Sequence, residues 1–384
     1  MTRNCKTASL IAFAALLSAG PAFTQTQSTE TTPEAKAAAP VAYVYVQTVK
    51  GVNLYDAAPD GKLTLVKGSP FQTVGELIGS NGKYLITLGT YDVHSYAVES
   101  NGAIGKQVSV VNTQDFDGGQ CGIDDPIGGP SGTAGAVLDH TGQNLYVSLA
   151  DADCSSYQTF NIAKGSGELT FNGDTVGTVW YGAPTITAND KFAYVPFSRT
   201  EQFSAFSRGT DGTLASISVN ETDPYDPEPL LAAADPTNHL ATWGTNIYGE
   251  PQFVGYTVDD GGNVASTNPA KNMPLPGGVY PTGLSISPSG KILAVAGAYF
   301  EDEPQGLFVL HFNGAEPVTP YSGVLTSDGV WSVRWDNNNH LYAIGRYLHV
   351  YTITPTSIKE APGSPYTLSS LEYINYGLVV VPKP

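Results

Sequence analysis

The sequence predicts an all-β fold built from seven repeated four-stranded modules. The chain of 384 residues contains 42 Gly, 27 Pro and 22 Tyr but only 2 Met. This composition favours many short strands joined by tight turns. A strand–turn–strand unit, clearest at 281–297, recurs along the whole chain. Its spacing is the third observation that predicts the fold.

The repeats are spaced as expected for the blades of a β-propeller. The first residues of the second strand in each repeat lie 41 to 61 residues apart, with one insertion in the longest interval. These anchors are Tyr43, Tyr84, Leu145, Phe192, Leu240, Ile292 and Leu341. The chain enters the first repeat at a second strand (42–46) and ends on a strand of the innermost type (376–381). We therefore predict one domain, 41–384, a seven-bladed β-propeller closed by its C-terminal inner strand.

Tight turns separate the third and fourth strands of most modules. They carry Asn-Gly or Asp-Gly pairs, in which glycine readily supplies the positive φ that such hairpins require. The pairs are Asp60-Gly61, Asn101-Gly102, Asp211-Gly212, Asp260-Gly261 and Asn313-Gly314.

The N-terminal segment predicts export. Residues 1–24 combine Arg3 and Lys6 with a short apolar run and small residues, which is typical of a secretory signal peptide. Residues 25–40 are polar and Pro-containing, as in a flexible linker. We expect a periplasmic or secreted monomer without membrane insertion. The formal net charge of -17 disfavours nucleic acid as a partner.

Two motifs resemble those of a known family. The run 287–295 (SPSGKILAV) resembles the SPDGRFLYV repeat of lactonase-like, 6-phosphogluconolactonase-type (YVTN-type) propellers, and 68–71 and 363–366 resemble their GSPF blade ends. The resemblance implies hydrolysis of a sugar lactone or a related cyclic ester. The family's His and Arg approaches to two inner strands are absent at 130–137 and 182–187. This favours the alternative, a non-catalytic propeller that binds a glycan, peptide or envelope protein.

Candidate acid–base residues lie where the loops approach the channel. Glu76 and Glu228 directly precede inner strands, and Arg199 and Arg346 are the candidate partners. A carboxylate paired with Arg could activate water or hold an anionic substrate. The alternative is a structural ion pair.

Aromatic residues recur at the same approaches and could stack on a small-molecule or glycan ligand. The alternative is packing between blades. The candidates are Trp180, Tyr181, Tyr225, Tyr280, Trp331 and Tyr376.

The third candidate site is a pair of loops on the same face. Cys121 and Cys154 are predicted to form a disulfide in an oxidising compartment. That bridge would bring together acidic residues that could bind Ca²⁺, although solvated acidic loops are the alternative. The candidate ligands are Asp115, Asp117, Asp124, Asp151 and Asp153.

Overall fold

The computed structural model describes most of the predicted propeller. The described ranges are 39–113, 132–150, 155–177, 182–196, 203–218, 228–245, 250–266, 271–274, 281–298, 305–368 and 377–383. The chain divides into two units, Met1–Ala37 and Ala38–Pro384, and the first lies outside these ranges together with the predicted signal peptide. Within the described ranges the regular structure is β, and no helix there is long and apolar enough to cross a membrane.

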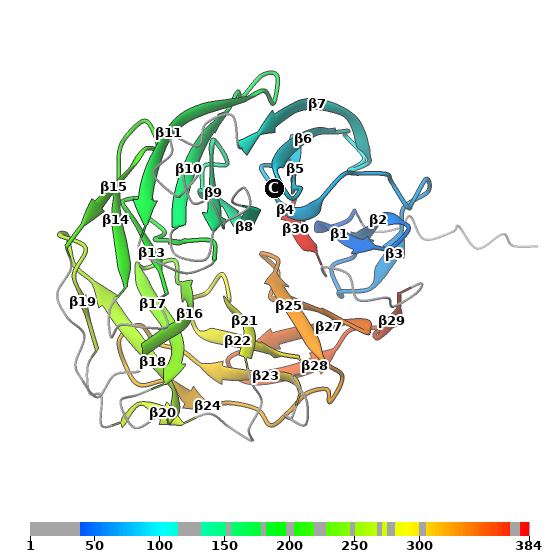
Figure 1. The fold of residues 1–384 in the computed structure, drawn as a ribbon. Coiled ribbons are helices and arrows are strands. Elements are labelled where there is room, and N and C mark those ends of the chain that lie inside the picture. Colours follow the sequence, from blue (N-terminus) through cyan, green and yellow to red (C-terminus); the bar gives the residue numbers. More distant parts are fainter. Residues whose placement is uncertain are drawn as a thin grey trace, which may run out of the picture. The chain divides into compact units, whose positions relative to one another are not determined.

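Seven antiparallel sheets form the blades of a ring, which confirms the predicted fold (Figure 1). The last strand, β30, pairs with β1 over Ala42↔Pro382 to Val46↔Leu378, so the C-terminal strand completes the first blade as expected. The inner strands, in ring order, are β30 (Leu378–Pro382), β4 (Glu76–Ser80), β8 (Gly132–Leu138), β12 (Thr185–Ile186), β16 (Glu228–Ala234), β21 (Pro281–Ile286) and β25 (Val330–Trp335).

The second and third strands of each blade form its buried middle. The second strands are buried and mostly apolar because neighbouring blades cover both of their faces, whereas the third strands also carry buried polar side chains such as His94, Gln158 and His349. The second strands are β1 (Ala42–Thr48), β5 (Tyr84–Leu88), β9 (Asn144–Ala150), β13 (Phe192–Val195), β17 (His239–Thr245), β22 (Ile292–Gly297) and β26 (His340–Gly345). The third strands are β2 (Gly51–Ala57), β6 (Asp92–Val98), β10 (Ser155–Ile162), β14 (Ser204–Arg208), β18 (Pro251–Val258), β23 (Gly306–His311) and β27 (Tyr347–Thr354).

The fourth strands form the outer edge of each blade. Short extra strands, β20 (Met273–Pro274) and β29 (Tyr366–Thr367), pair with β18 and β27 where the chain leaves two blades. The fourth strands are β3 (Leu63–Leu65), β7 (Ile104–Asn112), β11 (Leu169–Gly177), β15 (Leu214–Ile217), β19 (Val264–Ala265), β24 (Thr319–Pro320) and β28 (Ser357–Glu360).

The hydrophobic core is divided among the junctions between blades. Each of the seven clusters of buried apolar side chains combines residues of two neighbouring blades. The cluster that closes the ring packs Val44 and Leu378 of the first blade against Tyr342 and Val350 of the last. No blade buries its apolar faces alone, because each face needs a neighbouring sheet.

The repeated strand–turn–strand unit has a common physical basis. A polar side chain at the end of the inner strand accepts backbone N–H groups of the turn, as Asp235 does from Thr237 and His239. Three residues later the backbone takes a positive φ. Glycine occupies this place in two blades, whereas Asn238 and Asn339 adopt φ values of 63°. Asn tolerates this conformation better than most residues, so the turn is kept without glycine.

The turns between third and fourth strands connect each blade to the preceding one. A Cβ on Gly102 would meet the Tyr43 ring, and one on Gly212 would meet Asn144. The last junction follows the same rule, because Gly61 of the first blade packs on His340 of the seventh. One predicted turn is corrected: the positive φ of the 260–262 turn falls at Gly262, since this turn packs against the preceding blade one residue later.

A buried polar network lies at this closing junction. The Asp336 carboxylate accepts hydrogen bonds from the Tyr342 hydroxyl at 2.9 Å and from the backbone N–H of His340 at 2.9 Å. Its Oδ2 also lies 2.7 Å from the His340 Nδ1. Burial alone would raise the pKa of Asp336, but the hydrogen bonds and charge of His340 hold it below its usual value.

Replacing Asp336→Asn should lower the free energy of unfolding by about 2–4 kcal/mol near pH 7, because a buried charged acceptor is lost. Folding lowers the pKa of this carboxylate, so its ionised form stabilises the protein at pH values above the pKa that it has in the unfolded chain. This stabilisation disappears as the pH falls through the pKa that it has in the folded protein. The difference between the two proteins in urea titrations should therefore shrink below about pH 4. Asp260→Asn, on a fully exposed side chain, is the control and should change stability by less than about 0.5 kcal/mol. An equally small change for Asp336→Asn would contradict the role of the network.

Candidate functional site

The structure locates three of the predicted site side chains. Glu76 is the first residue of β4, Trp331 lies in β25, and Arg346 lies between β26 and β27. The backbone of Glu228 begins β16. The other candidates lie outside the described residues: Arg199, Trp180, Tyr181, Tyr225, Tyr280, Tyr376, Asp115, Asp117, Asp124, Asp151, Asp153, Cys121 and Cys154.

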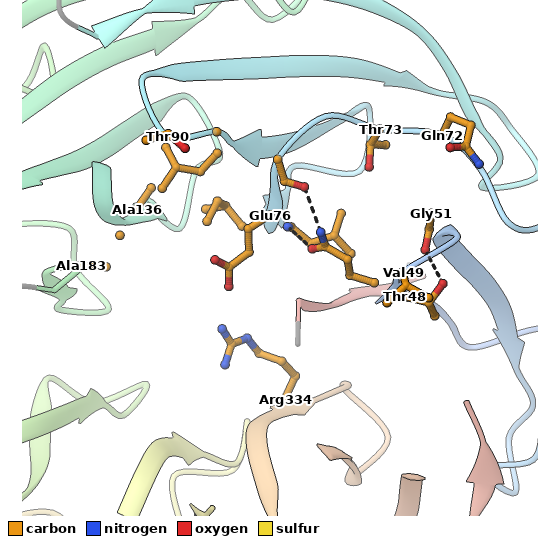
Figure 2. A pocket seen from close by; sticks show the side chains of 17 residues that line it. Thr48, Val49, Gly51, Gln72, Thr73, Glu76, Thr90, Ala136, Ala183 and Arg334 are labelled. Atoms are coloured by element: carbon orange, nitrogen blue, oxygen red, sulfur yellow. Dashed lines mark hydrogen bonds between the residues drawn. The ribbon is translucent and has the colours of Figure 1, made fainter. Parts of the chain in front are cut away.

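A cavity of about 680 Å³ opens where the first two blades meet at the channel. Its wall includes the end of β1 with the following turn, the connection that leads into β4, and the residues that follow β5. Small residues of the third and fourth blades, such as Ala136 and Ala183, border it on another side. Arg334 reaches the same cavity from β25 of the seventh blade (Figure 2). Residues from five blades thus surround one space.

Glu76 is positioned by a side chain of the neighbouring blade. Gln47 donates from Nε2 to the Gly75 carbonyl at 3.0 Å, and its Oε1 accepts the Leu77 N–H at 2.9 Å. These two bonds hold the backbone on both sides of Glu76, as Figure 2 shows. Because Leu77 is buried in the cluster between the first two blades, alternation along the strand directs Glu76 away from that cluster.

A β-bulge follows Glu76 directly. The register of β4 against β5 shifts between Leu77 and Gly79. Comparable shifts occur in β8, β16, β21 and β25. Bulges bend a strand and redirect its side chains, and they are frequent beside active sites. Five inner strands thus carry the same irregularity around the channel.

Arg334 is the cationic member of the site. Val333 and Trp335 on either side of it are buried between blades, so alternation points Arg334 the other way, where its side chain is open to water. The side chain lines the cavity and is exposed to water within it. It donates from Nη1 to the Val333 carbonyl at 2.8 Å.

Glu76 and Arg334 point toward one another across the cavity, and no hydrogen bond joins them (Figure 2). Burial raises the pKa of the Glu76 carboxyl above its usual value, and the charge of Arg334 reduces this increase. Burial likewise lowers the pKa of Arg334, with the opposite effect from Glu76. The Arg334 guanidinium nevertheless stays charged at neutral pH, because arginine does not lose its proton in proteins. The pair therefore offers a proton acceptor and a fixed positive charge with space between them.

The other two described candidates are not part of this cavity wall. The Arg346 guanidinium lies 5.7 Å from the centre of the Tyr347 ring, and the side chain is exposed. Trp331 occupies the bulge position of β25 and is 37% exposed. Arg334, which was not predicted from the sequence, is therefore the arginine that lies opposite Glu76, whereas Arg346 lies elsewhere and Arg199 lies outside the described residues.

Sequence reasoning missed Arg334 and Gln47. A usable signal for Arg334 existed, since it is the only Lys or Arg in the seven inner strands. Gln47 carried no comparable signal, because its role depends on a contact with a residue 30 positions away.

The described residues contain no group of three or more His, Cys, Asp or Glu side chains that could hold a metal ion. The acidic loops predicted to bind Ca²⁺ lie outside those residues. The cation site therefore stays a prediction.

Comparison with known proteins identifies the fold. No family model matches the chain, and no curated protein matches it. Among solved structures, the periplasmic gluconolactonase of Pseudomonas aeruginosa has a TM-score of 0.60 at 13% identity, covering 89% of this chain and 99% of that one. A Bacteroides fragilis protein provisionally described as a 6-phosphogluconolactonase has a TM-score of 0.59 at 12% identity, covering 88% and 97%. A Lactobacillus plantarum protein has a TM-score of 0.58 at 12% identity, covering 88% and 98%. The chain thus shares the seven-bladed propeller fold of lactonase-type proteins.

Proposed function

We propose that the protein hydrolyses a small lactone in the cavity between Glu76 and Arg334. The observation that carries this proposal is the geometry of the pair: a carboxyl with a raised pKa faces a guanidinium across a cavity of about 680 Å³. Titratable groups whose pKa values are shifted by burial and by a charged partner in a cleft are candidates for a functional site. The fold shared with a gluconolactonase supports the same class of substrate by analogy.

The proposed reaction uses both groups of the pair. The Glu76 carboxylate takes a proton from water while the water oxygen attacks the carbonyl carbon of the ring ester. Negative charge then develops on the carbonyl oxygen, where the fixed charge of Arg334 stabilises it. When the ring C–O bond breaks, the leaving oxygen receives the proton from Glu76. The product is a hydroxy acid whose carboxylate can pair with Arg334.

Export is part of the proposal. Residues 1–24 have the pattern of a secretory signal peptide, and one structural neighbour is periplasmic. A periplasmic or extracellular location would expose the protein to lactones outside the cytoplasm.

Trp331 favours a second candidate function, the binding of a ligand without hydrolysis. Trp331 is 37% exposed in an inner strand, and an exposed aromatic residue can stack on a sugar ring or a peptide. Saturable binding of a glycan or peptide, lost in Trp331→Ala, together with absence of lactone hydrolysis would select this candidate.

Substituting Glu76→Gln or Arg334→Met should reduce kcat/KM for lactone hydrolysis by about 10²–10³-fold each, because one removes the proton acceptor and the other the charge that stabilises the oxyanion. A panel of aldonolactones and simple γ- and δ-lactones, followed by proton release at constant pH, measures this. Glu99→Gln and Lys106→Met replace exposed side chains and are the matched controls. Thermal unfolding would show that the variants are folded. Full activity in Glu76→Gln would overturn the proposed base.

The pH dependence should report the raised pKa of Glu76. Since the base must be ionised, kcat/KM should rise with pH along a limb whose midpoint lies above 4.5, the ordinary value for this group. Arg334 lowers the Glu76 pKa, so the same limb should move to higher pH in Arg334→Met. Profiles of kcat/KM between pH 4 and 8 test both statements. A limb that stays in place in Arg334→Met would show that the two groups are not coupled.

A further inference from the structure

Three exposed apolar side chains belong to the loops whose residues line the cavity. The described residues include seven large hydrophobic side chains that are exposed, and three of these belong to the loops around it: Val49 at 38%, Val74 at 53% and Tyr91 at 38%. Val49 lines the cavity itself. Val74 stands between the lining residues Thr73 and Gly75, and Tyr91 directly follows the lining residue Thr90. We name Val49, Val74 and Tyr91 the apolar rim.

The backbone of the apolar rim is held in place. The Val74 N–H donates to the Tyr96 hydroxyl at 2.9 Å, and its carbonyl accepts the Thr87 hydroxyl. The Tyr91 carbonyl accepts both the N–H of Thr113, at 2.9 Å, and the hydroxyl of that residue, at 3.0 Å. These loops therefore present their apolar side chains to water on a fixed backbone.

The cavity and the rim differ in chemistry. Glu76 and Arg334 supply opposite charges inside the cavity, and Thr48, Thr73 and Thr90 add polar groups to its wall. The rim offers two valine side chains and the ring of Tyr91, whose hydroxyl is its one polar side-chain group. A ligand that satisfies both regions has a compact polar head and an apolar extension.

We propose that the ligand is a lactone with an alkyl tail, whose ring enters the cavity between Glu76 and Arg334 while the tail lies over the apolar rim. The assignment of the head as a lactone rests on the proposed function. The assignment of the tail rests on the rim alone. A sugar lactone, which is polar on all sides, would leave the rim uncovered.

A small amphiphile fits the rim better than a protein partner does. Stable protein interfaces bury about 800 Å² or more on each side, with some 20–30 residues. The rim comprises three side chains next to a charged cavity, which suits a short hydrocarbon chain continuous with a polar head. A second copy of this chain or another protein would show itself as a change in mass, which the test below includes.

A series of γ-lactones that differ only in tail length, from γ-butyrolactone to γ-decalactone, tests the proposal. Catalytic efficiency should rise about twofold for each of the first few methylene groups. Full burial of a methylene group would raise it about fourfold, and a tail that lies on an open rim should gain about half of that free energy. In Val74→Ser this rise should be clearly smaller. The matched control is Val110→Ser, because Val110 is 52% exposed on the outer strand of the same blade, and this variant should keep the wild-type rise.

A binding arm separates this proposal from the hydrolytic one. Calorimetric titration with linear alkanoates from acetate to decanoate measures tail recognition without chemistry, since their carboxylates can pair with Arg334. If no lactone is hydrolysed but affinity rises with tail length and falls in Val74→Ser, the hydrolytic function fails and the rim proposal stands. If lactones are hydrolysed but neither efficiency nor affinity depends on tail length, the rim proposal is overturned and hydrolysis stands. A wild-type dimer in light scattering that Val74→Ser dissociates, without any tail dependence, would also overturn it.

Discussion

The pairing of β30 with β1 is the constraint on which the rest of the structure depends. It joins the two ends of the repeat array, from Ala42↔Pro382 to Val46↔Leu378, and removes the open edges that an unclosed array would have. Every hydrophobic cluster lies between two blades, so each blade is stabilised by both neighbours. Closure supplies the last of these junctions. The same pairing sets β30 between β25 and β4, and this brings Arg334 and Glu76 to opposite sides of one cavity.

The candidate site shows why a closed ring suits chemistry between charged groups. Arg334 is exposed to water in the cavity, and its charge still lowers the pKa of the Glu76 carboxyl. Burial in turn raises the pKa of the carboxyl, which keeps it a better proton acceptor than an exposed glutamate. Gln47 fixes the backbone around Glu76 through two hydrogen bonds. The backbone that carries Glu76 is therefore held in one position beside the cavity.

Sequence reasoning predicted the number of blades, their strand order and the circular closure, because these follow from local patterns that repeat. The turn at 287–290 and its relatives are recognisable one at a time, since a polar side chain and a positive φ three residues later are needed within each unit. The candidate site followed only in part. Glu76 was proposed from its place before an inner strand and lines the cavity, whereas the arginines proposed with it were Arg199 and Arg346. Its place as the only Lys or Arg in an inner strand was a usable signal for Arg334, but the sequence does not show that it faces Glu76, because 258 residues separate them.

The sequence by itself determined the scaffold: a ring of seven modules that cannot bury their apolar faces singly, with a C-terminal strand of the type that the first module lacks. The tertiary structure alone decided which side chains share the cavity. Closure brings the first, second and seventh blades together, and the Gln47 hydrogen bonds and the register of β25 then aim Glu76 and Arg334 at one another. The tertiary structure also decided that the side chains of Val49, Val74 and Tyr91 are exposed to solvent in the loops around that cavity. The physical reason is that repeat patterns act over a few residues, whereas a channel site is assembled from single positions on blades far apart in sequence.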